Sequence, residues 1–258
     1  MHAPVPEIIP AETLLLAYRS GIFPMADRRD DPDIFWVEPR RRAIIPLDGF
    51  RCSHSLAKLL RREKFRVTCN GAFAEVVRCC AAPRPGHPES WISERIAASY
   101  QALHRAGHAH SIECWEDGKL VGGLYGVGFD RVFCGESMFS RARDASKVAL
   151  AWLVASMKQA GCTLLDCQFM TSHLASLGAI EIRQSEYLRL LAAAQTPSFA
   201  GAGLDSGAGW GEGAGLGLGD GLGAGDGVPL GFAALLGESA SGCSSPGKLI
   251  AQSLTQTS

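Results

Sequence analysis

Two short stretches decide the fold class: FCGESMFSR, Phe133–Arg141, and LLDCQ, Leu164–Gln168. Each begins with apolar residues, as a buried strand does, and each carries one carboxylate, Glu136 in the first and Asp166 in the second. The residues between them, 145–160, have the apolar spacing of a helix. A strand–helix–strand unit with acids near its strand ends is a common way to build a small reaction site, so function depends on whether these two acids face one cleft.

The sequence on both sides of this unit predicts alternating helices and strands. Ser53 and Ser55 can each cap a helix, and Asn70 is expected to cap the next one. The turn at residues 116–119 is expected to join two strands of a meander. Helices are expected at 11–19, 53–64, after 70, 93–107, 145–160, 172–177 and 186–194, and strands at 35–37, 43–45, 65–69, 111–115, 120–127, 131–134 and 163–166.

The end of the chain differs from the rest in composition. From Gly201 to Gly227, glycine occupies nearly every second position. Such a segment buries too little apolar surface to offset the ordering entropy of glycine, so a flexible linker is expected. We therefore divide the chain into a small N-terminal domain (1–45), a larger central domain (46–197) and a Gly-rich flexible tail (198–258). Within the tail, residues 246–258 are a possible docking segment, as a short strand.

Bulk composition fits a soluble globular protein, with 47% hydrophobic and 20% charged residues. No apolar run approaches the ~20 residues that span a bilayer, and the N-terminus lacks the features of a signal peptide, so a cytoplasmic location is expected. The nine cysteines have no zinc or redox spacing. Reduced thiols and no metal site are expected.

Positive charge is concentrated in one part of the chain. Residues 40–84 hold 11 Lys and Arg against three Asp and Glu, whereas the whole chain has a net charge of −1. A solvated face is one interpretation of these clusters. Attraction to a phosphate backbone is the other.

Seven motifs in register resemble the bacterial leucyl/phenylalanyl-tRNA–protein transferases. The resemblance runs in order from about Ala11 to Leu191 and leaves out the glycine-rich tail. The motifs are Tyr18–Met25, Phe35-Trp36, Ser90–Ile92, Gly122–Gly126, Gly135–Arg141, Asp166–Gln168 and Ser172–Ala179.

This resemblance implies an enzyme that moves Leu or Phe, and Met less readily, from aminoacyl-tRNA to the N-terminal Arg or Lys of a protein, marking that protein for the N-degron pathway. It implies an α+β fold, in which a small N-terminal α/β domain precedes a GNAT-like acyltransferase domain with a mixed central sheet flanked by helices. No metal or cofactor is implied, because the tRNA ester is already an activated acyl donor. We expect a monomer with no membrane association.

The resemblance also assigns residues to the two halves of the donor. Trp36 and Trp91 match tryptophans that hold the terminal adenosine, and base stacking on an aromatic ring contributes roughly 1–3 kcal/mol. Without the resemblance, packing would be the more common interpretation of both tryptophans. The residues that the resemblance assigns to the aminoacyl pocket would be equally compatible with ordinary core. The aminoacyl pocket maps onto Leu124, Phe133, Leu150, Leu153 and Leu165.

Asp166 and Gln168 are the expected catalytic residues. Burial at a strand end should make Asp166 a proton acceptor for the attacking amine, and Gln168 points to the same side if the strand continues. Asp166→Asn should then leave folding intact and lower turnover. The alternative is that Asp166 only caps a turn. Glu136 is expected to recognise the acceptor N-terminus, and its alternative is an ion pair with Arg141 or Arg143.

Residues of the basic stretch could contact the tRNA backbone: Arg40, Arg41, Arg42, Lys58, Arg61 and Arg62. Two other functions remain open from the sequence. One is a coenzyme-A-dependent N-acyltransferase, although Asp144–Ser146 replaces the glycine-rich pyrophosphate loop of GNAT acetyltransferases. The other is a non-enzymatic RNA-binding adaptor. His173 is more often structural than catalytic in such a context, and a covalent cysteine mechanism lacks an adjacent base.

Overall fold

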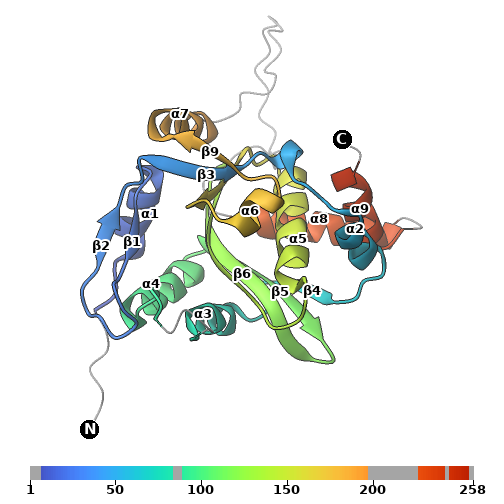
Figure 1. Cartoon of the computed structure of the whole chain (residues 1–258), viewed down its shortest axis with the longest axis horizontal. Helices are drawn as coiled ribbons and strands as arrows, with labels where there is room; N and C mark the ends of the chain where they lie inside the picture. The colour runs from blue at the N-terminus through green and yellow to red at the C-terminus, as the bar shows by residue number, and fades with distance from the viewer. Residues whose placement is uncertain (1–6, 84–88, 197–225, 242–243, 256–258) are drawn as a thin grey trace, which may run out of the picture.

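The computed structural model of this chain describes residues 7–83, 89–196, 226–241 and 244–255 (Figure 1). Its centre is a seven-stranded sheet with the strand order β4-β5-β6-β7-β8-β3-β9. The strands are β3 (Arg41–Ile45), β4 (Arg66–Cys69), β5 (Ala109–Glu116), β6 (Lys119–Phe129), β7 (Val132–Ser140), β8 (Leu164–Gln168) and β9 (Ile180–Arg183). A separate two-stranded ribbon is formed by β1 (Phe23–Met25) and β2 (Phe35–Val37).

One parallel pair interrupts an otherwise antiparallel sheet. β7 and β8 run parallel, and α5 (Ala145–Gln159) makes the crossover between them. A parallel pair needs such a crossover, whereas β5 and β6 are joined by the tight turn that the sequence predicts. The mixed sheet flanked by helices confirms the expected α+β fold class.

The two faces of the sheet carry separate cores. One core contains α2 (His54–Arg61) and α5, together with the C-terminal helices α8 (Gly227–Ser241) and α9 (Pro246–Thr255). The other contains α1 (Ala11–Arg19), α3 (Phe73–Ala81), α4 (Glu94–Arg105) and α7 (Gln184–Gln195). Figure 1 shows the first group to the right of the sheet and α1, α3 and α4 to its left. The short elements are η1 (Leu47–Gly49) and α6 (Ser172–Ser176).

Three local expectations are wrong. β3 pairs with β8 and β9, so it belongs to the main sheet and not to an N-terminal unit ending at residue 45. β9 is absent from the expected strands, because its exposed, charged pattern resembles a helix start. Asn70 does not cap α3: its Oδ1 accepts from the Ser111 amide, and the Glu113 carboxylate accepts from the amides of Gly71 and Ala72 instead.

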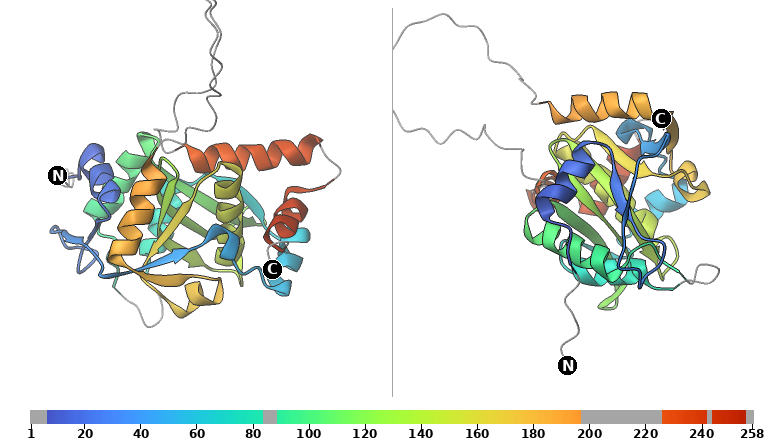
Figure 2. Two further views of the ribbon diagram at one scale, coloured as in Figure 1. Left: turned by 90° about the horizontal axis from the view of Figure 1, so that it is seen from above. Right: turned by 90° about the vertical axis from the view of Figure 1, so that its left-hand side faces the viewer.

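The C-terminal part of the chain also departs from expectation. Residues 227–241, expected to be flexible, form the helix α8, and Pro246–Thr255, expected as a strand if it docked, forms the helix α9. α8 packs across α5, and α9 packs beside α2 (Figure 2). In the contact between α8 and α5, the ring centroids of Trp152 and Phe232 are 5.0 Å apart. The linker expected over most of 198–226 lies outside the described residues.

α5 is apolar around its whole circumference because it is enclosed by the sheet on one side and by α2 and α8 on the other. Close packing with α8 requires glycine at one position. A Cβ atom on Gly231 would lie 1.9 Å from the carbonyl oxygen of Ser156. The C-terminal segment therefore supports the helix whose other side lines the cavity described below.

We predict that Gly231→Ala destabilises the protein by roughly 2 kcal/mol or more, because α8 must move away from α5. The matched control is Gly237→Ala in the same helix, where a new Cβ meets no atom within 4 Å. Because alanine has a higher helix propensity than glycine, this control should leave stability unchanged or increase it. Urea unfolding followed by tryptophan fluorescence measures both, and equal stabilities would contradict this packing.

Candidate active site

A cavity of about 580 Å³ opens where β7 and β8 stop pairing. The last paired residues are Cys134 and Asp166, and the cavity is lined by the strand ends that follow them. α5 forms its inner wall with Leu150 and Leu153. The remaining lining includes Met25, Trp91, Leu124, Tyr125, Gly135–Ser140, Ser146, Leu165, Cys167–Phe169, Thr171, His173 and Leu174.

Both strands that frame the cavity are bulged at the expected site residues. On β7, Gly135 and Ser137 pair with consecutive residues of β6, so Glu136 is the extra residue. On β8, Asp166 and Gln168 pair with consecutive residues of β3, so Cys167 is the extra residue. A bulge re-aims side chains locally and is common beside active sites. Gln168 also has φ +61°, a left-handed conformation that is costly for a residue other than glycine.

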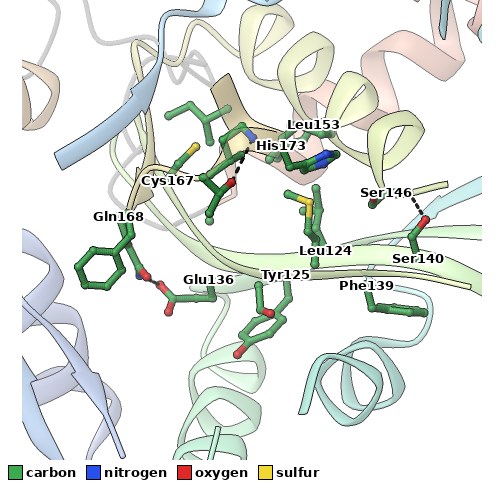
Figure 3. A pocket seen from close by; sticks show the side chains of 18 of the residues that line it. Leu124, Tyr125, Glu136, Phe139, Ser140, Ser146, Leu153, Cys167, Gln168 and His173 are labelled. Carbon is green, nitrogen blue, oxygen red and sulfur yellow. Dashed lines mark hydrogen bonds between the residues drawn. The ribbon is translucent and has the colours of Figure 1, made fainter. Parts of the chain in front are cut away.

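These bulges bring Glu136 and Gln168 together at the cavity. Nε2 of Gln168 donates a hydrogen bond to Oε1 of Glu136 at 2.9 Å (Figure 3). The other carboxylate oxygen accepts from the hydroxyl of Tyr100 at 2.8 Å, and that hydroxyl also hydrogen-bonds to Tyr18. Glu136 therefore sits at the end of a chain of buried polar groups that reaches α1.

Burial raises the pKa of Glu136 to about 7, against hydrogen bonds from Tyr18, Tyr100 and Gln168 that favour its charged form. The side chain is 8% exposed and makes no ion pair within the described residues, so the expected alternative pairing with Arg141 or Arg143 is absent there. A carboxyl group that changes charge near neutral pH is suited to proton exchange.

Asp166 lies in a different environment. It is fully buried, and its two oxygens receive hydrogen bonds from Nε and Nη2 of Arg42 at 2.6–3.1 Å. The hydroxyl of Tyr187 donates to it at 2.9 Å, and so does the amide of Gln168 at 2.8 Å. Burial alone would lower the pKa of Arg42, but the neighbouring Asp166 carboxylate raises that pKa above its ordinary value.

Asp166 therefore lies behind the residues that line the cavity. Asp166 does not line the cavity, and it reaches the cavity only through the Gln168 amide that it holds. The two side chains do not face the cavity together, because the bulge at Cys167 ends the regular alternation of β8. Asp166 is not a turn cap alone either, since it is the buried partner of Arg42.

Most of the expected aminoacyl-pocket residues line the cavity: Leu124, Leu150, Leu153 and Leu165. Phe133 does not, because it points into the core beside Gly126. Trp91 also lines the cavity, whereas Trp36 does not. Trp36 is 40% exposed on β2, opposite Pro24 of the ribbon. The structure thus brings one of the two expected tryptophans to the site.

The end of the cavity near α5 is polar. Ser140 accepts a hydrogen bond from the Ser146 amide, and the ring of His173 projects toward the same region (Figure 3). Burial lowers the pKa of His173, and the nearby Lys147 adds to this effect, so the imidazole is neutral at pH 7. His173 Nε2 is buried without a hydrogen-bond partner among the described residues.

The expected tRNA-backbone residues fall into two groups. Arg40, Arg41, Lys58, Arg61 and Arg62 are exposed, although Arg41 pairs with Glu181. Arg42 is 1% exposed, and its charge is taken by Asp166, so the expectation that it contacts tRNA is wrong. The helix α2, which carries Lys58 and Arg61, packs beside α9.

Sequence reasoning missed the tyrosines of the site. All four tyrosines of the chain are almost completely buried. Tyr18 and Tyr100 form the chain to Glu136, the ring of Tyr125 packs against that of Tyr100, and Tyr187 donates to Asp166. The available signal was the residue type, because the hydroxyl of a buried tyrosine usually finds a polar partner.

Every cysteine that the structure describes is a free thiol. The described residues contain no cluster of three His, Cys, Asp or Glu placed to hold a metal ion. No helix in the described ranges is long and apolar enough to cross a membrane.

We predict that Asp166→Asn destabilises the protein by about 3 kcal/mol or more, because it leaves the Arg42 guanidinium buried without its counter-charge. This replaces the expectation that folding stays intact. The matched control is Asp130→Asn, which removes the partner of Arg19 in a more exposed pair and should cost about 1 kcal/mol or less. Urea unfolding compares the two, and a small loss in Asp166→Asn would refute the assignment.

We further predict that Glu136→Gln alters how stability depends on pH. Between its ordinary pKa of 4.5 and about 7, the folded protein binds more protons at Glu136 than the unfolded chain does, so the free energy of unfolding falls as pH rises. Glutamine removes this loss. From pH 5 to pH 8 the free energy of unfolding should fall by about 2 to 3 kcal/mol more in the parent than in the variant, measured by urea unfolding at both pH values. A parallel pH dependence in both proteins would contradict it.

Comparison with known proteins agrees with the motif resemblance. Residues 44–192 match the family described as leucyl/phenylalanyl-tRNA protein transferase, and residues 8–40 match its N-terminal domain. Among solved structures, the chain resembles L-PGS from Bacillus licheniformis with a TM-score of 0.37 and 15% identity, over 64% of this chain and 55% of that one.

Curated relatives carry the name leucyl/phenylalanyl-tRNA–protein transferase. The protein from Novosphingobium aromaticivorans is 65% identical over 98% of both chains. Those from Rhizorhabdus wittichii and Zymomonas mobilis are 57% and 53% identical, over 76% and 74% of this chain and 78% and 72% of theirs. This chain therefore belongs to the leucyl/phenylalanyl-tRNA–protein transferase family, whose activity is aminoacyl transfer from tRNA to protein.

Proposed function

We propose that this enzyme transfers Leu or Phe, and Met less readily, from aminoacyl-tRNA to the N-terminal Arg or Lys of acceptor proteins. The product is a new peptide bond, and the new N-terminus marks the acceptor for N-degron degradation. The observation that carries the proposal is a cavity with leucine walls that opens beside the Glu136–Gln168 pair. The proposal includes a cytoplasmic location, a monomeric state and a GNAT-like catalytic domain.

The donor half of the cavity suits a hydrophobic aminoacyl group. Leu124, Leu150, Leu153 and Leu165 give an apolar wall that excludes charged side chains by their desolvation cost but separates Leu, Phe and Met weakly. Trp91 lines the cavity, and we assign to it the stacking contact with the terminal adenosine. We retain Trp36 as a second, outer contact for the same end of the tRNA.

The reaction requires only alignment and proton transfer, because the ester is already activated. Gln168 positions the attacking amine or the ester carbonyl, and its strained backbone is held by the Asp166 carboxylate. Asp166 is thus a positioning residue. Glu136 faces the cationic N-terminus of the acceptor. Arg40, Arg41, Lys58, Arg61 and Arg62 are exposed and supply positive charge for the tRNA backbone.

The coenzyme-A alternative is disfavoured by the start of α5. The side chain of Asp144 lies there and forms ion pairs with Arg143 and Lys147. A carboxylate at this helix end opposes a pyrophosphate group, which a helix N-terminus would otherwise attract.

We predict that incubation of this protein with charged Phe-tRNA and a peptide bearing N-terminal Arg yields a peptide heavier by one Phe residue, detected by mass spectrometry. The same peptide with an acetylated N-terminus should give no product, because it has no free amine. Transfer from an acyl coenzyme A but not from Phe-tRNA would favour the alternative enzyme. Tight binding of charged and uncharged tRNA alike, with no transfer, would favour the adaptor.

A further inference from the structure

Glu136 and Asp166 are the two carboxylates linked to Gln168, and their partners differ. Asp166 is neutralised by the Arg42 guanidinium, which contacts both of its oxygens. Among the described residues, Glu136 has neutral donors only: the hydroxyls of Tyr100 and Tyr18 and the side-chain amide of Gln168. Both oxygens of Asp166 are thus occupied by a cation, whereas Glu136 makes no ion pair among the described residues, and its burial raises its pKa.

Access separates the two groups as well. Glu136 lines the cavity and Asp166 does not. Gln168 also lines the cavity, and its Nε2 donates a hydrogen bond to Oε1 of Glu136 at 2.9 Å. If Gln168 aligns the amine or the carbonyl, the group that reaches Glu136 is the acceptor's amine rather than its more distant side chain. This step rests on the proposed function.

We propose that Glu136 is the catalytic residue that accepts the proton of the acceptor's α-ammonium group. An N-terminal Arg carries two cations, its α-ammonium and its guanidinium. The guanidinium does not give up a proton, whereas an α-ammonium has an ordinary pKa of about 7.7–8.0. Proton transfer to Glu136 is therefore matched to the α-ammonium and not to the side chain.

The proton and electron balance is simple. The N–H bond of the ammonium breaks, an O–H bond forms on the Glu136 carboxylate, and the freed lone pair of nitrogen attacks the ester carbonyl carbon. When the tetrahedral intermediate collapses, the bond between that carbon and the ribose oxygen breaks. The departing oxygen takes a second proton from nitrogen, and Glu136 later releases the first to solvent.

The groups around Glu136 support this role. Burial raises the pKa of Tyr18, Tyr100 and Tyr125 well above the ordinary value, so these hydroxyls remain protonated. Tyr100 therefore acts only as a donor to the carboxylate. The ionisable groups that face Glu136 are Tyr18 from α1, Tyr100 from α4, Tyr125 from β6, Cys134 from β7 itself and Asp166 from β8, which is paired with Arg42 of β3.

The test is the pH dependence of single-turnover transfer from bound Phe-tRNA to a saturating Arg peptide. Tyr100→Phe deletes a hydrogen bond that stabilises the charged form of Glu136, so the acidic limb of the profile should move to higher pH by about 1 unit. The matched control is Tyr125→Phe, whose buried hydroxyl has no hydrogen-bond partner among the described residues, and the limb should stay in place. The amine's own titration is common to all three enzymes.

Glu136→Gln completes the test. Its rate at pH 7 should fall by about 10²-fold or more, while the preference for peptides with N-terminal Arg over N-terminal Ala is retained. A near-normal rate with the Arg preference lost would overturn the inference and make Glu136 a recognition group. An unmoved limb in Tyr100→Phe would also overturn it, even if Glu136→Gln fails to fold. Absence of transfer by the parent enzyme would instead refute the proposed function.

Discussion

The buried ion pair between Arg42 and Asp166 is the interaction on which the rest of the site depends. It joins β3 to β8, and the same guanidinium donates to the carbonyl oxygen of Gly21 and lies against the rings of Phe23 and Tyr187. One side chain thus connects the N-terminal ribbon, the sheet and α7. Because an unpartnered buried charge is strongly unfavourable, these elements are held in one arrangement.

This arrangement positions the cavity-lining residues indirectly, through a chain of hydrogen bonds. Asp166 holds the amide of Gln168, Gln168 donates to Glu136, and Glu136 accepts from Tyr100. The strained backbone of Gln168 and the uncompensated burial of Glu136 both cost stability. Such costs concentrate where alignment and proton affinity matter more than stability. The Arg42–Asp166 pair and the packing of α5 between the sheet and α8 offset them.

Much of the fold could be predicted from local patterns. α5 and the Ser93 cap of α4 follow from apolar spacing and capping chemistry, which act over a few residues. β9 and the C-terminal helices could not be predicted so easily. α8 is glycine-bearing and weakly patterned, and it exists because Gly231 and Phe232 fit against α5, which lies far away in sequence.

The sequence by itself determined the family, the fold class and some of the residues that line the cavity, because motifs and periodicity are local properties. Only the tertiary structure decided their roles. From the sequence, Arg42 is one of three adjacent arginines expected at the surface, but the pairing of β3 with β8 buries it against Asp166. Asp166 and Gln168 were expected on the same side of the strand, but the bulge at Cys167 turns them in different directions. Burial, hydrogen bonding and charge pairing arise between distant segments, so proton affinity belongs to the folded arrangement and cannot be read from neighbouring residues.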